Sequence, residues 1–455
     1  MKGHRRGQAL VPVLFIMVIL VSVAVTLTLR VRGDNRTSAA AVAQAQAHWI
    51  ARGAVTSMAA QLAQLSNGGA VAPELAPPPD TDANGWTRAG DGWYRIEAID
   101  TSARLNVNLA STASLSLLPV LRDDPSLACA IVDWRDSNET PEAYNGSQGA
   151  ESDTYQALPR PYSAKNAPLD TLGELLLLRG FTAGMLYGPA GGAGSMADAG
   201  SDLADTLAGT RQQAVEATEA TPPLCELLTT YSRERNVDAT GAQRTNILTA
   251  AADTLVSRLG IARTLADRLV QRRSQTGADG VKNVSDLLNV PGFTRTVMQS
   301  IGDKVTVTDE PFRPGVVNVN LAPTEVLAAL PGVDQPVLSA LMTARQGGTT
   351  FAGLNDVFQL TTLNRQQLQV LIDNLCAKSS VYLVRVRVRM PGLAMPYVVE
   401  ALVDLPAAEA TTTPEAGADA QVAPPPGRVL QWREVARNPG WSSWRSAGRA
   451  STGGP

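Results

Sequence analysis

Six carboxylate side chains lie within one turn-rich segment, residues 133–155, whose residue types are the best suited to chemistry in this chain. They are Asp133, Asp136, Glu139, Glu142, Glu151 and Asp153. Oxygen ligands at irregular spacing suit Ca²⁺, whereas Zn²⁺ prefers nitrogen and sulfur ligands. The spacing is not that of an EF-hand, so the segment predicts either a structural calcium site or a solvated acidic loop.

Histidine and cysteine are too sparse to build the commonest catalytic and zinc sites. His4 and His48 both lie close to the N-terminus, which excludes a Ser-His-Asp triad or a His-rich zinc site in the main body. Cys129, Cys225 and Cys376 are widely spaced and allow at most one disulfide. A membrane-anchored hydrolase built on acidic residues is one functional hypothesis. No pair of acids stands out as catalytic, so we predict that the chain is not an enzyme.

The composition describes a folded and weakly acidic chain. Of its 455 residues 44% are apolar, which is enough to bury a substantial core, and the length corresponds to about three domains. The formal net charge of −3 argues against binding of nucleic acid through overall charge, although it leaves a local basic patch open.

The N-terminus combines a short basic segment, residues 1–7, with an uncharged apolar run, residues 9–29. At ~1.5 Å per residue this run is about 31 Å long, enough to cross the ~30 Å hydrocarbon core of a bilayer. The basic flank keeps that end in the cytoplasm, so the rest of the chain is exported. An uncleaved signal anchor and a cleaved secretory signal are alternatives, although no A-x-A site follows the run.

The membrane helix is expected to continue, so that it covers residues 8–66. Val55, Met58 and Leu62 recur at helical spacing, and Asn67 with two following glycines ends the pattern. A Pro-rich linker comes next, and the alternating segment 92–100 then predicts a strand within a region of residues 86–103.

Three related segments form an internal repeat, and we expect each to be a helical unit. The units are residues 104–190, 244–308 and 315–380, and each places an Asn-containing extended segment before an amphipathic helix. Turns at Gly180, Gly292 and Gly332 complete a helix-hairpin-helix pattern. We expect each unit to have a small core of its own.

A helix-hairpin-helix motif binds DNA when the amides of a Gly-x-Gly turn hold a phosphate. Here Thr182, Thr294 and Asp334 replace the second glycine, and an aspartate would repel a phosphate. We therefore favour protein-facing scaffolds over nucleic-acid binding. A membrane-anchored helix-hairpin-helix DNA-binding protein of a competence-type system is the alternative function.

The C-terminal part predicts a β-hairpin, residues 381–405, and then a linker and mostly disordered tail, residues 406–455. Within that last part, the short apolar segment 429–435 is a candidate edge strand.

Three arginines alternate with apolar residues along the first strand of this hairpin. Arg385, Arg387 and Arg389 predict a solvated strand face, and Glu400 and Asp404 are their expected acidic partners across the hairpin.

The leader resembles that of type IV pilins and pseudopilins, because a basic segment ending in Gly7 precedes the apolar helix. In that family a prepilin peptidase cuts after the glycine, so the resemblance implies cleavage between Gly7 and Gln8. Most members carry Glu at the fifth mature position, where this chain has Pro12. The K component of type II secretion is known for lacking that glutamate.

Longer motifs resemble the K-type minor pseudopilin family of type II secretion, also called general secretion pathway protein K. They are RLNVNLAST from Arg104, VDWRDSNETPEAY from Val132, PYSAKNAPLDTLGEL from Pro161, VNVNLAPTEVLAAL from Val317 and VYLVRVRVRM from Val381. The resemblance implies an α+β fold: a long N-terminal transmembrane helix and a pilin-like α/β domain with inserted helical, SAM-like units. The family usually has two such units, so residues 244–308 would be an extra one. It also implies structural Ca²⁺ in the acidic loop.

The same resemblance implies a position and partners. The family's K subunit stands at the pseudopilus tip with the I and J minor pseudopilins, in a filament of the major pseudopilin. The secretin and secreted cargo are further candidate contacts. The chain would then be a single-pass protein of the bacterial inner membrane, with its C-terminal head in the periplasm.

Overall fold

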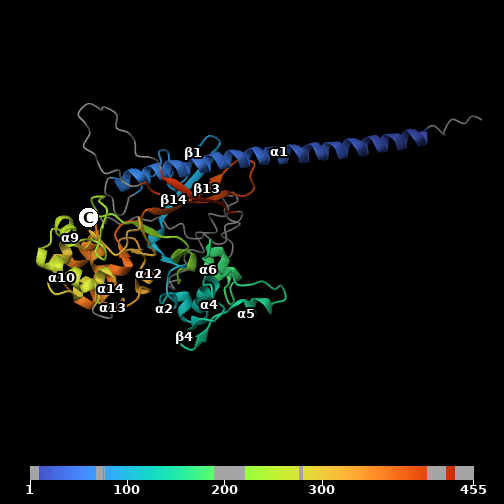
Figure 1. The fold of residues 1–455 in the computed structure, drawn as a ribbon. Helices are drawn as coiled ribbons and strands as arrows, with labels where there is room; N and C mark the ends of the chain where they lie inside the picture. Colours follow the sequence, from blue (N-terminus) through green and yellow to red (C-terminus); the bar gives the residue numbers. More distant parts are fainter. Residues whose placement is uncertain are drawn as a thin grey trace, which may run out of the picture.

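The computed structural model describes residues 10–67, 75, 77–188, 221–275, 280–406 and 427–435. The expected cleavage site at Gly7 and Gln8 lies outside the described residues. So do most of the linker that follows the C-terminal hairpin, residues 407–426, and the tail after residue 435. The described chain consists of one long helix, one antiparallel sheet and three helical units, an α+β arrangement as predicted (Figure 1).

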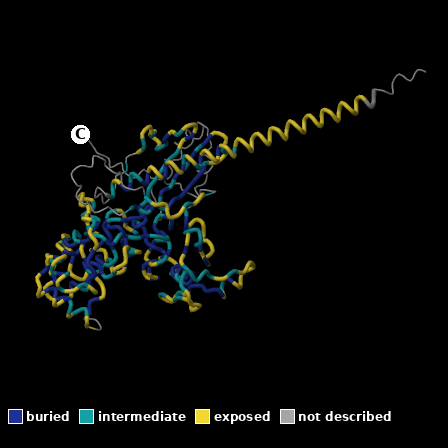
Figure 2. The backbone as a smooth tube through the Cα atoms, turned by 45° about the horizontal axis from the view of Figure 1, so that its top comes forward, coloured by how far each residue is buried: buried dark blue, intermediate teal, exposed yellow. Residues whose placement is uncertain are grey.

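The long helix α1 (Leu10–Asn67) has two halves in different surroundings. All side chains of residues 13–29 are exposed, whereas Val55, Met58 and Leu62 in the second half are buried. Figure 2 shows the first half as an exposed rod that projects from the rest of the molecule. The predicted helix is therefore confirmed from Leu10 onward, and one face of its second half packs against the protein.

The sheet that receives α1 has five antiparallel strands in the order β1-β2-β13-β14-β15. Their bounds are β1 (Thr87–Ala89), β2 (Gly92–Asp100), β13 (Val381–Arg389), β14 (Tyr397–Asp404) and β15 (Arg428–Glu434). Successive side chains of a strand point to opposite faces, so Val384, Val386 and Val388 together form the face that packs on α1. The expected strand, hairpin and edge strand are all confirmed.

The arginine face of β13 differs from the prediction in two ways. Arg385 does bond to Glu400, with 3.0 Å between Nε and Oε1. Asp404, however, stands opposite Val381 in the register and pairs with Arg233 at 2.8 Å. The face is also not solvated, because helical units cover it: only 13% of the Arg385 side chain is exposed (Figure 1).

The three helical units are built from short elements. The first contains η1 (Thr101–Ala103), β3 (Leu105–Asn106), α2 (Thr112–Leu115), α3 (Pro119–Arg122), α4 (Pro125–Arg135), β4 (Ala143–Tyr144), β5 (Ser147–Gln148), α5 (Ser152–Gln156), η2 (Leu172–Leu177), α6 (Ala183–Tyr187), α8 (Leu224–Leu227) and β6 (Leu228–Thr229). The second contains β7 (Arg233–Arg235), β8 (Thr245–Asn246), α9 (Ala252–Leu259), α10 (Arg263–Arg273), η4 (Val284–Asn289), α11 (Arg295–Ile301), β9 (Val305–Thr306) and β10 (Phe312–Pro314). The third contains β11 (Val317–Asn318), α12 (Thr324–Ala328), α13 (Gln335–Gln346), η5 (Leu354–Gln359), α14 (Arg365–Asn374) and β12 (Leu375–Cys376).

Each unit is closed by a parallel pair of two-residue strands, which joins its beginning to its end. β3 pairs with β6, β8 with β9, and β11 with β12. The asparagine of each first strand accepts a hydrogen bond from the amide two residues on, at 2.9 to 3.0 Å. This turn explains why Asn recurs at the start of each repeat, because its side chain replaces a backbone acceptor.

An arginine near the end of each main helix fixes this turn, and it was missed in the sequence. Arg273 donates to the Ala250 carbonyl and Arg345 to the Ala322 carbonyl, each at 2.7 Å. In the first unit Arg135 donates to the carbonyls of Val107 and Ala110.

The predicted hairpin glycines occupy two different places in the repeat. Gly180 and Gly292 follow η2 and η4 with φ of 86° and 101°, a region that favours glycine. Gly332, with φ of 74°, instead precedes α13 and corresponds to Gly260 between α9 and α10.

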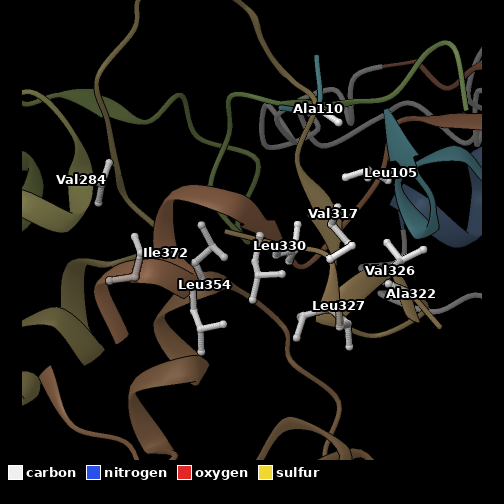
Figure 3. Close-up of a cluster of buried hydrophobic side chains, with 14 of the residues drawn as sticks. Leu105, Ala110, Val284, Val317, Ala322, Val326, Leu327, Leu330, Leu354 and Ile372 are labelled. Atoms are coloured by element: carbon white, nitrogen blue, oxygen red, sulfur yellow. The ribbon is translucent and has the colours of Figure 1, made fainter. Parts of the chain in front are cut away.

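The three units share one hydrophobic core, so the expectation of three separate cores is wrong. One cluster of buried side chains extends from Leu105 to Leu375 and includes residues of every unit; Figure 3 shows part of it. Between the second and third units α11 packs on η5 and α14 on η4. Arg295 also donates to the Leu360 carbonyl at 3.1 Å. Elements this short bury too little apolar surface alone, so neighbouring units complete each other.

Candidate functional site

The acidic loop lies between α4 and α5 of the first helical unit. Asp124 caps the N-terminus of α4, whose last turns carry Asp133 and end at Asp136. A tight turn at Asn145 and Gly146, with φ of 51° and 81°, joins β4 to β5 and returns the chain. The loop then leads to Glu151 at the start of α5.

Asp133 is completely buried, and only one of its two carboxylate oxygens has a hydrogen-bond partner. Its Oδ1 accepts a hydrogen bond from the Glu142 amide at 2.7 Å, whereas its Oδ2 has no partner. Gly149 lies against the same carboxylate, and a Cβ added there would be 1.9 Å from Oδ2. Burial raises the pKa of Asp133. A buried carboxylate oxygen without a partner is energetically costly, and either a proton or a cation beside it would lower that cost.

Glu151 is the second buried carboxylate of the loop, and neither of its oxygens has a partner. Burial, followed by the charges of Asp133, Asp136 and Glu139, raises its pKa to about 7. The Oδ1 atom of Asn166 is another buried oxygen without a partner, while its Nδ2 donates to Glu139 at 2.8 Å.

The structure brings five of the six expected ligands into one electrostatic group and leaves Asp153 outside it. Asp133, Asp136 and Glu139 all act on Glu151. The charge of Glu142 acts on Asp133, and its carboxylate also accepts a hydrogen bond from the Thr112 hydroxyl at 2.6 Å. Asp153 is exposed on α5. Across the described residues, no three such side chains already converge on one metal position.

The donor set nevertheless fits calcium. The oxygens without partners, two on Glu151 and one each on Asp133 and Asn166, are carboxylate and amide oxygens, which Ca²⁺ accepts in flexible geometry. Asn166, which the sequence reasoning missed, has a left-handed φ of 48° and lies outside the acidic segment.

The helix-hairpin-helix turns present capped helices rather than open phosphate sites. The side chains of Thr182, Thr294 and Asp334 accept hydrogen bonds from the amides at the starts of α6, α11 and α13. Because these caps occupy the place a phosphate would need, the structure supplies no argument for nucleic-acid binding.

The exposed half of α1 is the other candidate functional element. The most apolar 18 residues of this helix have a mean hydropathy of 2.5 and are entirely exposed, and within the described residues no other helix is long and apolar enough to cross a membrane. This half fits a single-pass membrane anchor.

Part of this chain is similar to a known protein family. Residues 102–187, which include the acidic loop, match the family model described as type II secretion system protein K. This part of the chain, about a fifth of its length, is therefore similar to type II secretion protein K. A comparison with curated proteins gives no match.

Five chains of solved structures match this chain. One belongs to the crystal structure of the GspK–GspI–GspJ complex of the enterotoxigenic Escherichia coli type 2 secretion system. That chain is 14% identical with a TM-score of 0.35, and the match covers 86% of this chain and 96% of that one.

Proposed function

We propose that this protein is a minor pseudopilin at the tip of the type II secretion pseudopilus, where it supports pseudopilus assembly and protein export. The observation that carries the proposal is the protein K family match over residues 102–187. The proposed role is structural, and no catalytic step is part of it.

The shape of the molecule supports a terminal position. The exposed half of α1 can pack among other membrane helices, while its second half is held under the sheet. The three helical units extend from the opposite side of the sheet and make a bulky head (Figure 1). A subunit with such a head is easier to place at the end of a filament than in its wall. Pro12 at the fifth mature position agrees with a chain that needs no pairing glutamate for a neighbour above it.

The proposed partners are the I and J minor pseudopilins, as in the complex named above, and the major pseudopilin. The anchor would lie in the bacterial inner membrane and the head in the periplasm. A prepilin peptidase would cut between Gly7 and Gln8, and the secretin and secreted cargo are further candidate contacts.

Secretion and co-purification test this proposal. Deleting the gene in its host should abolish export of type II cargo, and the full chain should restore it and co-purify with the I and J proteins. Gly7→Leu should block both processing, seen by intact mass, and export. Gly3→Leu, in the same basic segment, is the matched control and should do neither. Normal export without the gene, or no association with I and J, would contradict the proposal.

We also propose a structural Ca²⁺ at the acidic loop, held by Asp133 and Glu151 with Asp136, Glu139 and Asn166 around them. It is supported by the buried oxygens without partners described above. Its role would be to neutralise the loop and so fix the end of α4 against α5.

A further inference from the structure

A cavity of about 310 Å³ lies between the first helical unit and the arginine face of the sheet. Its walls include Arg104 before β3, Tyr187 of α6, Cys225 of α8, Arg385 of β13, Glu400 of β14 and Arg433 of β15. Its volume is near the lower limit of ordinary small-molecule pockets. The acidic loop contributes nothing to it.

Arg104 is the unusual wall residue of this cavity. It is only 8% exposed, and its guanidinium has no hydrogen bond or ion pair with any residue that the structure describes. Burial, and then the charge of Arg385, lowers its pKa to about 10, so it is still protonated at neutral pH. None of its nitrogens is a fully buried atom without a partner, so its unused donors open onto the cavity, where an anion can meet them.

The internal repeat shows which anion such an arginine takes. Arg244 precedes β8 as Arg104 precedes β3, and it is equally buried. It makes a bidentate pair with Glu234 at 2.9 and 3.0 Å and bonds to Asp303 Oδ1 at 2.9 Å. In the third unit the same position is the apolar Val316, which needs no partner. At this position of the repeat, the second unit therefore has an arginine paired with carboxylates and the third has an apolar side chain. The first has an arginine without a bonded carboxylate.

Charged side chains of both signs line the cavity, and their bonds leave Arg104 out. Arg385 bonds to Glu400, stands opposite Glu97 in the sheet register and shares Glu400 with Arg433. The cavity wall also carries Asp170 and Glu434, so its three arginines and three carboxylates balance. Asp170 is bonded to Lys165 and Glu434 to Tyr397, so Glu400 is the wall carboxylate that bonds to the arginines, and it bonds to Arg385 and Arg433 rather than to Arg104.

We propose that this cavity is a carboxylate-binding site in which the Arg104 guanidinium forms a bidentate pair with the ligand, as Arg244 does with Glu234. The carboxylate belongs either to a small organic acid or to an acidic side chain of a partner protein. The site is independent of the proposed calcium and does not depend on the role in export.

The proposal is tested by calorimetric titration of the full chain in detergent micelles. The small-acid probe is succinate, with the neutral succinamide as its control. The side-chain probe is acetyl-Ala-Glu-Ala-amide, with the corresponding Gln peptide as its control. Saturable binding of either acidic probe, with binding of its neutral control at least about tenfold weaker, is expected. Whichever acidic probe binds identifies the source of the carboxylate.

Variants separate the role of Arg104 from general charge. Arg104→Met should weaken the acidic probe at least about tenfold, while Arg104→Lys should keep part of the affinity. Arg122→Met, which removes an exposed arginine outside the cavity, should leave binding unchanged. If neither acidic probe binds the unaltered chain, or the neutral controls bind equally, the proposal is wrong. These two outcomes need no variant to fold, and equal binding by Arg104→Met would overturn it as well.

Discussion

The first and second helical units have the same plan but treat their buried charges in opposite ways. In the second unit Arg244, Glu234, Asp303 and Arg313 form a closed network in which every charge meets its opposite. In the first unit Asp133 and Glu151 have buried oxygens without a partner, and Arg104 makes no ion pair with any residue that the structure describes. A complete network needs nothing from outside and is structural, whereas the open charges of the first unit are the places where we propose ligands. The match to the protein K family falls on the same unit.

Deleting the second unit should have the largest effect, and it tests whether that unit is structural. Deleting residues 244–308 should abolish cooperative unfolding of the full chain in micelles, because that unit shares its core with the third. Circular dichroism during heating measures the loss. Deleting β15, residues 427–435, is the control and should leave a cooperative transition, since β15 is a largely exposed edge strand. A cooperative transition after deletion of 244–308 would show that the units fold separately.

Exchanging the two equivalent arginines for methionine compares the closed and open networks directly. Arg244→Met should lower the free energy of unfolding by about 3–5 kcal/mol, because Asp303 would remain buried without an ion-pair partner and Glu234 would keep only Arg313. Arg104→Met should change the free energy of unfolding by less than about 1 kcal/mol, because no carboxylate loses a hydrogen bond in this variant. Urea denaturation of the full chain measures both. Equal losses would mean that Arg104 has a stabilising partner after all.

Calcium should sharpen the contrast by stabilising the first unit. At a hundredfold excess over Kd, Ca²⁺ should add about 2.7 kcal/mol to the stability of the folded chain, and EDTA should reverse the gain. Mg²⁺ should do less, because it demands octahedral geometry. Asp133→Asn with Glu151→Gln should remove the response, whereas Asp153→Asn, at an exposed site, should keep it. An unchanged melting temperature and no bound metal by elemental analysis would identify a metal-free loop.

A further expected effect is a pH dependence from Glu151. Its pKa of about 7 in the folded chain lies above the ordinary value of 4.5, so between these pH values the folded state holds a proton that the unfolded state has lost. Calcium-free stability should therefore fall as the pH rises from about 4.5 to about 7, and Glu151→Gln should flatten that slope. Melting in EDTA across this window measures it. A slope that persists in the variant would point to another group, such as Asp133, whose pKa burial also raises.

Local patterns in the sequence were sufficient for most of the fold. The uncharged run and the Val55, Met58 and Leu62 spacing predicted α1, and strict alternation predicted β13 and β14. Repeated asparagines and glycines located the three units. These features depend on neighbours within a few residues, which is why the chain itself reveals them.

The candidate site was predicted only in part, because burial and contact depend on distant residues. Glu142 and Asp153 looked like the other acids of the loop, but the fold turns one toward Thr112 and the other to solvent. Asn166 enters the group through a left-handed turn well after the acidic segment. The sequence shows how many carboxylates the loop contains, whereas only the tertiary structure determines which of them are buried away from solvent.

The sequence by itself therefore determined the membrane helix, the strands, the repeat and the acidic character of one loop, since each is a property of local order. Tertiary structure alone decided that the units share one core, that Asp404 pairs with Arg233, and that the arginine face of β13 is covered. It also decided that Arg104 and Arg244, alike in the sequence repeat, differ in their partners. The physical reason is that Glu234 and Asp303 come from segments before and after the second unit's helices, so only folding brings them to Arg244.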